Sequence, residues 1–164
     1  MQLRPHQKKA IQAMSKHNKG QVIVPTGGGK TICMIQDAIE QFKSDRLKTI
    51  VVVAPRILLA NQLCEEFLEF IDDVDVLHVH SGETHHTSTT KSKVIEEWYW
   101  ASKKHQLIFT TYHSLHKIQD ATAMLPDTVY FDEAHNAVQK NFIEAVEHHS
   151  MYVVRNYFFT ATPK

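Results

Sequence analysis

The sequence is poor in cysteine, has no excess of charge of either sign and lacks a long apolar run. Its 164 residues include two cysteines, Cys33 and Cys64. Both fall within helical patterns, so we expect reduced, buried thiols in a cytoplasmic protein. The 18 basic residues match the 18 acidic ones, which argues against a generally basic coat and confines any nucleic-acid site to a local patch. No run could span a membrane, the polar N-terminus does not resemble a secretory signal, and the length suits one domain.

A glycine-rich segment near the N-terminus stands between a strand pattern and a helix pattern. The apolar run 21–24 indicates a buried strand, and the sequence PTGGGKT at 25–31 follows it. Glycines let backbone N–H groups approach a phosphate, and the helix that follows adds the positive end of its dipole. Lys30 could reach the β- and γ-phosphates, and the Thr31 hydroxyl could hold Mg²⁺. Val24 stands where the usual pattern opens with glycine, so an ordinary glycine-rich turn is the alternative; the surrounding strand and helix favour a nucleoside triphosphate site.

An acidic pair follows a second apolar run about a hundred residues later. The β-branched and aromatic run 128–131 ends in Asp132-Glu133-Ala134-His135. Ligands bind at the carboxyl ends of strands in open α/β sheets. Asp132 would therefore hold Mg²⁺ through its water shell, and Glu133 would orient and deprotonate the attacking water. The alternative is a solvated acidic turn, which the preceding strand and the phosphate loop make less favourable.

Together these motifs resemble the first RecA-like domain of a superfamily 2 helicase or translocase. The branch that they resemble most contains DEAH-type DNA helicases and the motor subunits of restriction enzymes. Further segments agree with this resemblance: Leu3-Arg4-Pro5-His6-Gln7, Ala54-Pro55-Arg56 with Leu59 and Gln62, Ser81-Gly82, Thr110-Thr111-Tyr112-His113-Ser114-Leu115 and Phe159-Thr160-Ala161-Thr162-Pro163. The motifs run from residue 3 to residue 163. We therefore expect residues 1–164 to form one helicase ATP-binding domain, with the second RecA-like domain absent from this chain.

The resemblance also implies roles for individual residues. It implies that ATP contacts Arg4, Gln7, Pro25, Thr26, Gly27, Gly28, Gly29, Lys30 and Thr31, with Gln7 reading the adenine edge. Lys30, Asp132 and Glu133 are the implied catalytic residues, with Mg²⁺ held by Thr31 and Asp132. The residues implied to couple the γ-phosphate to the rest of the motor are His135, Thr160 and Thr162, and those implied to contact nucleic acid are Arg56, Gly82, Thr110 and Thr111.

The nucleic-acid residues have a physical rationale and an alternative. Arg56 begins a helix after a proline, so its guanidinium and the helix N-terminus could meet one phosphate. Thr110 and Thr111 end a strand and offer hydroxyl donors. The alternatives are a solvent-facing arginine and ordinary strand-end threonines.

The order of elements predicts an α/β fold of the RecA-like phosphate-loop type. Strands that alternate with helices imply a parallel sheet with helices on both faces and right-handed crossovers. We expect helices at about 5–17, 31–43, 56–70, 92–102, 114–119 and 139–148, and strands at 21–24, 48–53, 75–79, 107–111, 128–131 and 157–160. The polar segment 80–90 is expected to be a mobile loop.

Twelve histidines raise the question of a metal site. The pairs His85-His86 and His148-His149 lack an accompanying Cys-x-x-Cys, and the acidic motif lacks the His-Glu-x-x-His spacing of zinc proteases. Surface histidines are the favoured interpretation, and a metal site is the alternative. The aromatic group 98–100 could stack on bases, although its helical spacing favours packing of one or two rings on the sheet.

The sequence thus predicts an ATP-dependent motor domain that acts on nucleic acid, with DNA favoured over RNA. The alternatives are a nucleotide-gated binding module without motor activity and an RNA helicase; Glu133 favours the enzyme because a pure switch needs no base. By resemblance, the arginines that complete the γ-phosphate site come from a second RecA-like domain, in cis beyond residue 164 or in trans. We therefore expect slow ATP hydrolysis by these residues alone, and no membrane partner.

Overall fold

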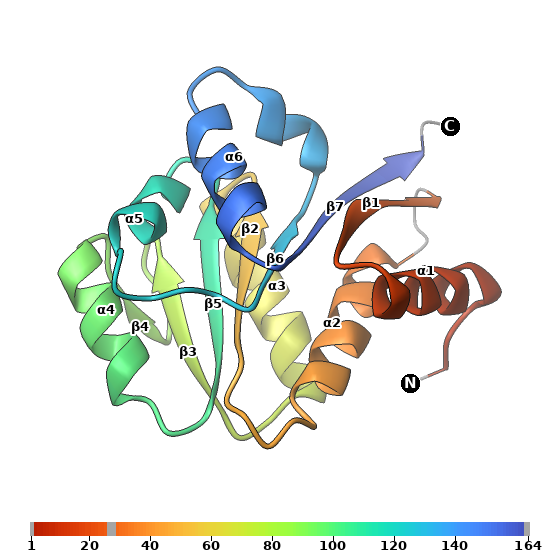
Figure 1. The fold of residues 1–164 in the computed structure, drawn as a ribbon, viewed down its shortest axis with the longest axis horizontal. Helices are drawn as coiled ribbons and strands as arrows, with labels where there is room; N and C mark the ends of the chain where they lie inside the picture. Colours follow the sequence, from red (N-terminus) through yellow and green to blue (C-terminus); the bar gives the residue numbers. More distant parts are fainter. Residues whose placement is uncertain (1, 26–28, 163–164) are drawn as a thin grey trace.

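The computed structural model describes residues 2–25 and 29–162, which form one parallel sheet with helices on both faces (Figure 1). The strand order is β1-β7-β6-β2-β5-β3-β4. The strands are β1 (Lys19–Pro25), β2 (Thr49–Ala54), β3 (Val74–Val79), β4 (Thr87–Ser88), β5 (His105–Thr111), β6 (Thr128–Phe131) and β7 (Arg155–Thr162). The helices are α1 (Pro5–Lys16), α2 (Lys30–Gln41), α3 (Ile57–Phe70), α4 (Ser92–Ala101), α5 (Leu115–Asp120) and α6 (Ile143–Tyr152), with the 3₁₀ helix η1 (Ala134–Val138). The predicted α/β fold is confirmed.

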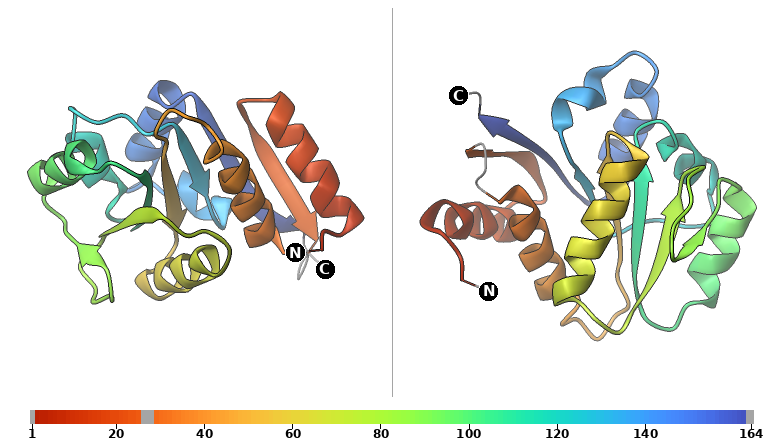
Figure 2. Two further views of the ribbon diagram at one scale, coloured as in Figure 1. Left: turned by 90° about the horizontal axis from the view of Figure 1, so that it is seen from below. Right: turned by 180° about the vertical axis from the view of Figure 1, so that it is seen from behind.

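The sheet separates two apolar cores, and the left view in Figure 2 shows helices on both of its sides. Side chains of a strand point to alternate faces, so the wholly buried β2 contributes to both. Ile50 and Val52 pack in the core that α1, α2 and α3 cover, whereas Val51 and Val53 pack beneath α4, α5 and α6. Both faces of the central strands are therefore shielded from water, which explains their continuous apolar runs.

A buried ion pair and its hydrogen bonds connect four elements away from the predicted site. Arg155, the first residue of β7, donates hydrogen bonds of 2.8 and 3.0 Å to the two carboxylate oxygens of Asp37 on α2. The same guanidinium donates to the Met14 carbonyl of α1 at 3.2 Å. The Tyr130 hydroxyl also donates to Asp37. Because each partner compensates the buried charge of the other, this network is a structural element of the fold.

The structure also corrects some expected boundaries. The helix expected at 139–148 begins at Ile143, because a tight turn closed by Phe142 N–H and the Gln139 carbonyl (2.9 Å) precedes it. Strands β1, β5 and β7 each begin two residues before their expected start, where they are already paired with a neighbour. The segment 80–90 contains the short strand β4, which pairs with β3.

Two expectations about side chains away from the motifs have different outcomes. Both cysteines are buried and free, as expected. The surface interpretation is wrong for His149, which is 2% exposed and bonds through Nδ1 to the Ala145 carbonyl at 2.8 Å. Among the described residues, no helix is long and apolar enough to cross a membrane.

Candidate nucleotide and nucleic-acid site

The segments predicted to carry function follow the carboxyl ends of parallel strands, which share one edge of the sheet. The phosphate loop follows β1, Arg56 follows β2, Gly82 follows β3 and the acidic motif follows β6. The segment that connects β5 to α5 begins at the same edge of the sheet (Figure 1). This arrangement brings residues that are far apart in sequence to one rim.

Gly29 shapes the start of α2, and Lys30 is the first residue of that helix. Gly29 has a φ of 74°, in the left-handed region that favours glycine. A Cβ at this position would lie 2.5 Å from Nε2 of Gln7, so the end of the Gln7 side chain would have to move to admit another residue. Pro25 ends β1 opposite Thr162. Thr26, Gly27 and Gly28 lie outside the described residues.

Lys30 meets both acidic residues of the predicted catalytic motif. Its Nζ donates a hydrogen bond to Oε1 of Glu133 and lies 3.3 Å from Oδ1 of Asp132. Burial by itself lowers the pKa of Lys30, but the bond to Glu133 and the charges of both carboxylates together raise it. Burial raises the pKa of Asp132, and the Lys30 ammonium opposes that rise. The free domain thus holds a partly buried cation between two carboxylates.

The oxygen atoms around Lys30 fit a magnesium ion. Oδ1 of Asp132 is buried and makes no hydrogen bond of acceptable geometry, although it lies within ion-pair distance of Lys30. Thr31 follows Lys30 on α2. Burial raises the pKa of Glu66 on the neighbouring α3, and the Thr31 hydroxyl partly opposes that rise. Carboxylate and hydroxyl oxygens are ligands that Mg²⁺ accepts. Sequence reasoning missed Glu66, because no motif marks an acidic residue in the middle of α3.

Glu133 occupies a backbone conformation that is uncommon for a residue with a side chain. Its φ is 49° and its ψ is 59°, and η1 begins directly after it. The Glu133 carbonyl accepts bonds of 3.0 Å from both the backbone and the side-chain nitrogen of Asn136. Such strained conformations concentrate at functional sites, where neighbouring contacts maintain them. Asn136 is thus a supporting residue that the sequence did not single out.

Two of the three residues implied to couple nucleotide to motion, His135 and Thr160, lie near one another. Nδ1 of the exposed His135 is 3.8 Å from Oε2 of Glu133. His135 and Thr160 line the same cavity, of about 470 Å³, between η1, α6 and β7. Thr162 is the last residue of β7.

Gln7 links the N-terminus of α1 to the phosphate loop. Its Oε1 accepts a 2.8 Å bond from the Arg4 backbone N–H, and its Nε2 donates a 3.3 Å bond to the Gly29 carbonyl. The side chain is 4% exposed. Gln7 therefore supports the loop in the free domain, and its contact with adenine stays a prediction.

Tyr112 connects the segment after β5 to the acidic motif. Its hydroxyl donates a 2.7 Å hydrogen bond to the Asp132 backbone carbonyl, and its ring stacks on Phe131 and Phe142. The side chain is 1% exposed. Tyr112 lies within the sequence motif 110–115, which by itself does not indicate a role for its side chain. The structure indicates a mechanical link between the two segments.

Two of the four residues expected to contact nucleic acid lie together at the rim. Arg56 is exposed and caps the N-terminus of α3. Gly82 packs against Ile57, the residue that follows Arg56, so closely that a Cβ on Gly82 would lie 2.5 Å from Cγ2 of Ile57. Thr110 and Thr111 are buried instead. The Thr110 hydroxyl donates to the Val79 carbonyl at 2.7 Å, so its hydrogen is already engaged. The Thr111 hydroxyl accepts from the Ser114 N–H at 3.3 Å, and its own hydrogen is not used in that bond.

Comparison with known families identifies the domain. Over residues 1–164 the sequence matches the family described as the type III restriction enzyme, res subunit. The chain belongs to this family. No curated protein matches the sequence. Family membership and the seven-stranded parallel sheet agree with the RecA-like fold expected from the sequence.

Solved structures share the fold of the res-subunit domain. A nuclease-deletion mutant of the type ISP restriction-modification enzyme LlaGI, in complex with a DNA substrate mimic, matches 100% of the chain with a TM-score of 0.83 and 22% identity. The Hef helicase domain of Pyrococcus furiosus matches 98% with a TM-score of 0.70 and 17% identity. The UvsW helicase of bacteriophage T4 matches 98% with a TM-score of 0.67 and 12% identity. The chain covers 18%, 32% and 52% of these proteins, respectively.

Proposed function

We propose that this domain binds ATP·Mg²⁺ between the phosphate loop and the acidic motif and drives translocation along DNA. The observation that carries the proposal is the convergence of Lys30, Asp132 and Glu133 at the carboxyl edge of the sheet. Because the pKa of Lys30 is raised, its side chain stays protonated at neutral pH and can pair with the β- and γ-phosphates. Mg²⁺, when held by Thr31 and Asp132, would supply the second positive charge.

Nucleotide binding also explains why Lys30 is paired with the proposed base. In the free domain the Lys30 ammonium engages the Glu133 carboxylate, which limits its access to other partners. A triphosphate competes for the same ammonium, so binding would release Glu133 to accept a proton from the attacking water.

We propose DNA as the nucleic acid. The support is that structures of two type ISP restriction-modification enzymes with this fold contain DNA or a DNA mimic. Arg56 and the N-terminus of α3 provide a guanidinium and backbone donors that suit one phosphate. Gly82 allows the adjacent loop to approach that point. Thr110 would act mainly by positioning the segment that carries Tyr112, because its hydroxyl already donates to the Val79 carbonyl, whereas the Thr111 hydroxyl keeps a hydrogen that a phosphate could accept.

Completion of the site by a second RecA-like domain, in cis or in trans, is part of the same proposal. The chain has four arginines, and two are committed elsewhere: Arg155 to Asp37, and Arg46 to Asp127 at 2.5 Å. An arginine that stabilises the transferring phosphate is worth about 10³–10⁵ in turnover in related phosphate-loop enzymes. The domain alone should therefore bind ATP but hydrolyse it slowly.

ATP titration and steady-state hydrolysis, with and without single-stranded DNA, test this proposal. We expect Mg²⁺-dependent ATP binding and slow turnover that Glu133→Gln abolishes. DNA affinity, measured by fluorescence anisotropy, should fall for Arg56→Ala. It should not change for the control Arg46→Ala, since Arg46 is an exposed arginine paired with Asp127 near the start of β2.

Three outcomes would contradict separate parts of the proposal. Failure to bind ATP would refute the nucleotide site, and tighter binding of RNA than of DNA would favour an RNA helicase. Brisk DNA-stimulated turnover by a proven monomer would show that no second domain is required. ATP binding that changes DNA affinity without any hydrolysis, even after a second domain is supplied, would favour the nucleotide-gated binding module.

A further inference from the structure

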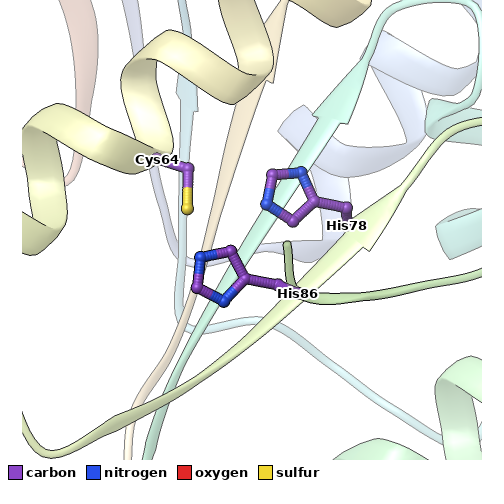
Figure 3. Close-up of side chains that lie close together, drawn as sticks. All are labelled: Cys64, His78 and His86. Carbon is purple, nitrogen blue, oxygen red and sulfur yellow. The ribbon is translucent and has the colours of Figure 1, made fainter. Parts of the chain in front are cut away.

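Three potential metal ligands from different elements converge beside α3, outside the nucleotide site. Cys64 lies on α3, His78 on β3, and His86 on the connection that leads to β4. One ligand atom from each of these side chains lies within 4.8 Å of the other two. Figure 3 shows the Cys64 sulfur and the two imidazole rings turned toward a common point. Cys64 and His78 are buried, and His86 is exposed.

The hydrogen bonds of His78 leave one ring nitrogen without a partner. The Gly82 N–H donates to Nδ1 of His80 at 3.1 Å, so the neutral His80 carries its proton on Nε2. That nitrogen lies 3.1 Å from Nδ1 of His78 and donates to it. Nε2 of His78 is then protonated, buried and without an acceptor among the described residues. A buried polar group in this state is unfavourable and indicates a missing partner.

The cluster opens onto a cavity that can complete a coordination sphere. The cavity has a volume of about 590 Å³, and Cys64, His78 and His86 are part of its lining. The side chains of Glu65, Glu83 and His85 line it as well. A water molecule or one of these groups could therefore occupy a fourth position.

We propose that Cys64, His78 and His86 bind a zinc ion. Zinc takes thiolate and imidazole ligands in tetrahedral geometry, with bonds of about 2.3 Å to sulfur and about 2.0–2.1 Å to nitrogen. The ligand atoms must move together by about 1 Å from their present separations, and His86 can do so because it is exposed on a connecting segment. A fourth ligand from the cavity lining would complete the four-coordinate geometry of a structural zinc site.

Zinc binding has a defined proton balance. The Cys64 thiol loses its proton to solvent, and zinc takes the place of the proton on Nε2 of His78. The His78 ring stays neutral by carrying its proton on Nδ1, from which it donates to Nε2 of His80. His80 then carries its own proton on Nδ1, so it no longer accepts the Gly82 N–H. His80 is thus a positioning residue, and zinc binding changes the hydrogen bond of Gly82.

The location of the cluster gives the ion a structural role at the rim. The residues between β3 and β4 include Gly82, which packs on Ile57 next to Arg56. A bond from His86 to an ion held by α3 and β3 would fasten this connection to the sheet and to α3. The zinc site does not share a residue with the proposed nucleotide site, so each can be tested without the other.

Cobalt substitution and zinc competition test the site in the complete 164-residue chain. One equivalent of Co²⁺ should give the visible bands of tetrahedral coordination and a thiolate charge-transfer band, and Zn²⁺ should displace it. His86→Ala should remove the tetrahedral bands and weaken zinc binding at least 100-fold while leaving the thermal melt of the metal-free protein unchanged, since His86 is exposed. His80→Ala should weaken zinc binding about 10–100-fold, as expected for a residue that orients a ligand.

Matched variants separate the cluster from other cysteines and histidines. Cys33→Ala removes the other buried cysteine and His116→Ala removes an exposed histidine of α5, and neither should change zinc affinity. In an NMR spectrum of the backbone amides, the chemical shift of the Gly82 N–H should change when zinc is added. The proposal is overturned by absence of the thiolate band at equimolar Co²⁺, by zinc binding that His86→Ala does not alter, or by binding of Cu⁺ in preference to Zn²⁺.

Discussion

Replacement of Lys30 should affect ATP binding in the opposite direction to replacement of Glu133. Within residues 2–25 and 29–162, Lys30 is the one cation that contacts both Asp132 and Glu133. In Lys30→Met the carboxylates lose this cation, and a triphosphate would meet uncompensated negative charge. A hydrogen bond that involves charged groups contributes about 1.5–3 kcal/mol, so ATP·Mg²⁺ affinity should fall by about 10- to 150-fold. Glu133→Gln leaves Lys30 in place and removes one competitor, so affinity should stay equal or rise.

Calorimetric titration with ATP·Mg²⁺ measures both effects. Methionine keeps most of the length of the Lys30 side chain, so this variant separates loss of charge from loss of packing. Thermal melts without nucleotide control for folding. The effect of pH adds a second test: burial raises the pKa of Asp132 and Lys30 opposes that rise. In Lys30→Met the carboxyl should therefore protonate more readily, and the remaining affinity for ATP·Mg²⁺ should fall faster than in the parent as pH decreases. Equal affinity of Lys30→Met and the parent protein would refute the assignment of Lys30.

Three further predictions concern adenine, the buried ion pair and acid stability. Gln7→Ala should erase any preference of the domain for ATP over GTP in competition titrations, and an unchanged ratio would exclude a role in adenine recognition. Arg155→Met should lower the free energy of urea unfolding by about 3–5 kcal/mol because it leaves the buried Asp37 carboxylate without its cation. The control Arg46→Ala, at an exposed ion pair, should lower that free energy by less than about 1 kcal/mol. Equal losses of stability in the two variants would contradict the structural role of the buried pair. Burial lowers the pKa of His149 to about 4 from an ordinary 6.5, so the unfolded chain binds a proton first as pH falls. Its contribution of about 3 kcal/mol should be present above pH 6.5 and lost between pH 6.5 and 4, and His149→Leu should flatten this part of the stability profile.

The sequence was most informative where function depends on strand ends. Parallel strands deliver their carboxyl ends to one edge of a sheet, so the phosphate loop and the acidic motif were expected to meet there. The contact of Lys30 with Asp132 and Glu133 agrees with that geometry. Strand order was not predicted, because alternating elements are compatible with several arrangements of the crossovers.

The sequence was least informative about sites whose residues share no motif and no regular spacing. Cys64, His78 and His86 come from three elements, and pairing of β3 with β4 helps to bring them together. The adjacent pair His85-His86 marks His86 as a possible metal ligand in the sequence. His78 stands alone in an apolar strand, so no sequence pattern marks it. His149 was misjudged for a related reason: α6 begins later than expected, so its buried face could not be inferred from the predicted register.

The rim and the acidic motif form one connected unit rather than a row of separate motifs. Thr110 is anchored to β3 through the Val79 carbonyl, and Tyr112, two residues further on, is bonded to the Asp132 carbonyl. A shift of the segment after β5 must therefore either move the backbone at Asp132 or break a buried hydrogen bond, which is unfavourable by about 1–3 kcal/mol when the acceptor stays buried. Movement of the backbone is the less costly response if the displacement is small. A strand of DNA that contacts this rim could thus alter the position of Asp132, and with it the contacts of Lys30, without touching either side chain.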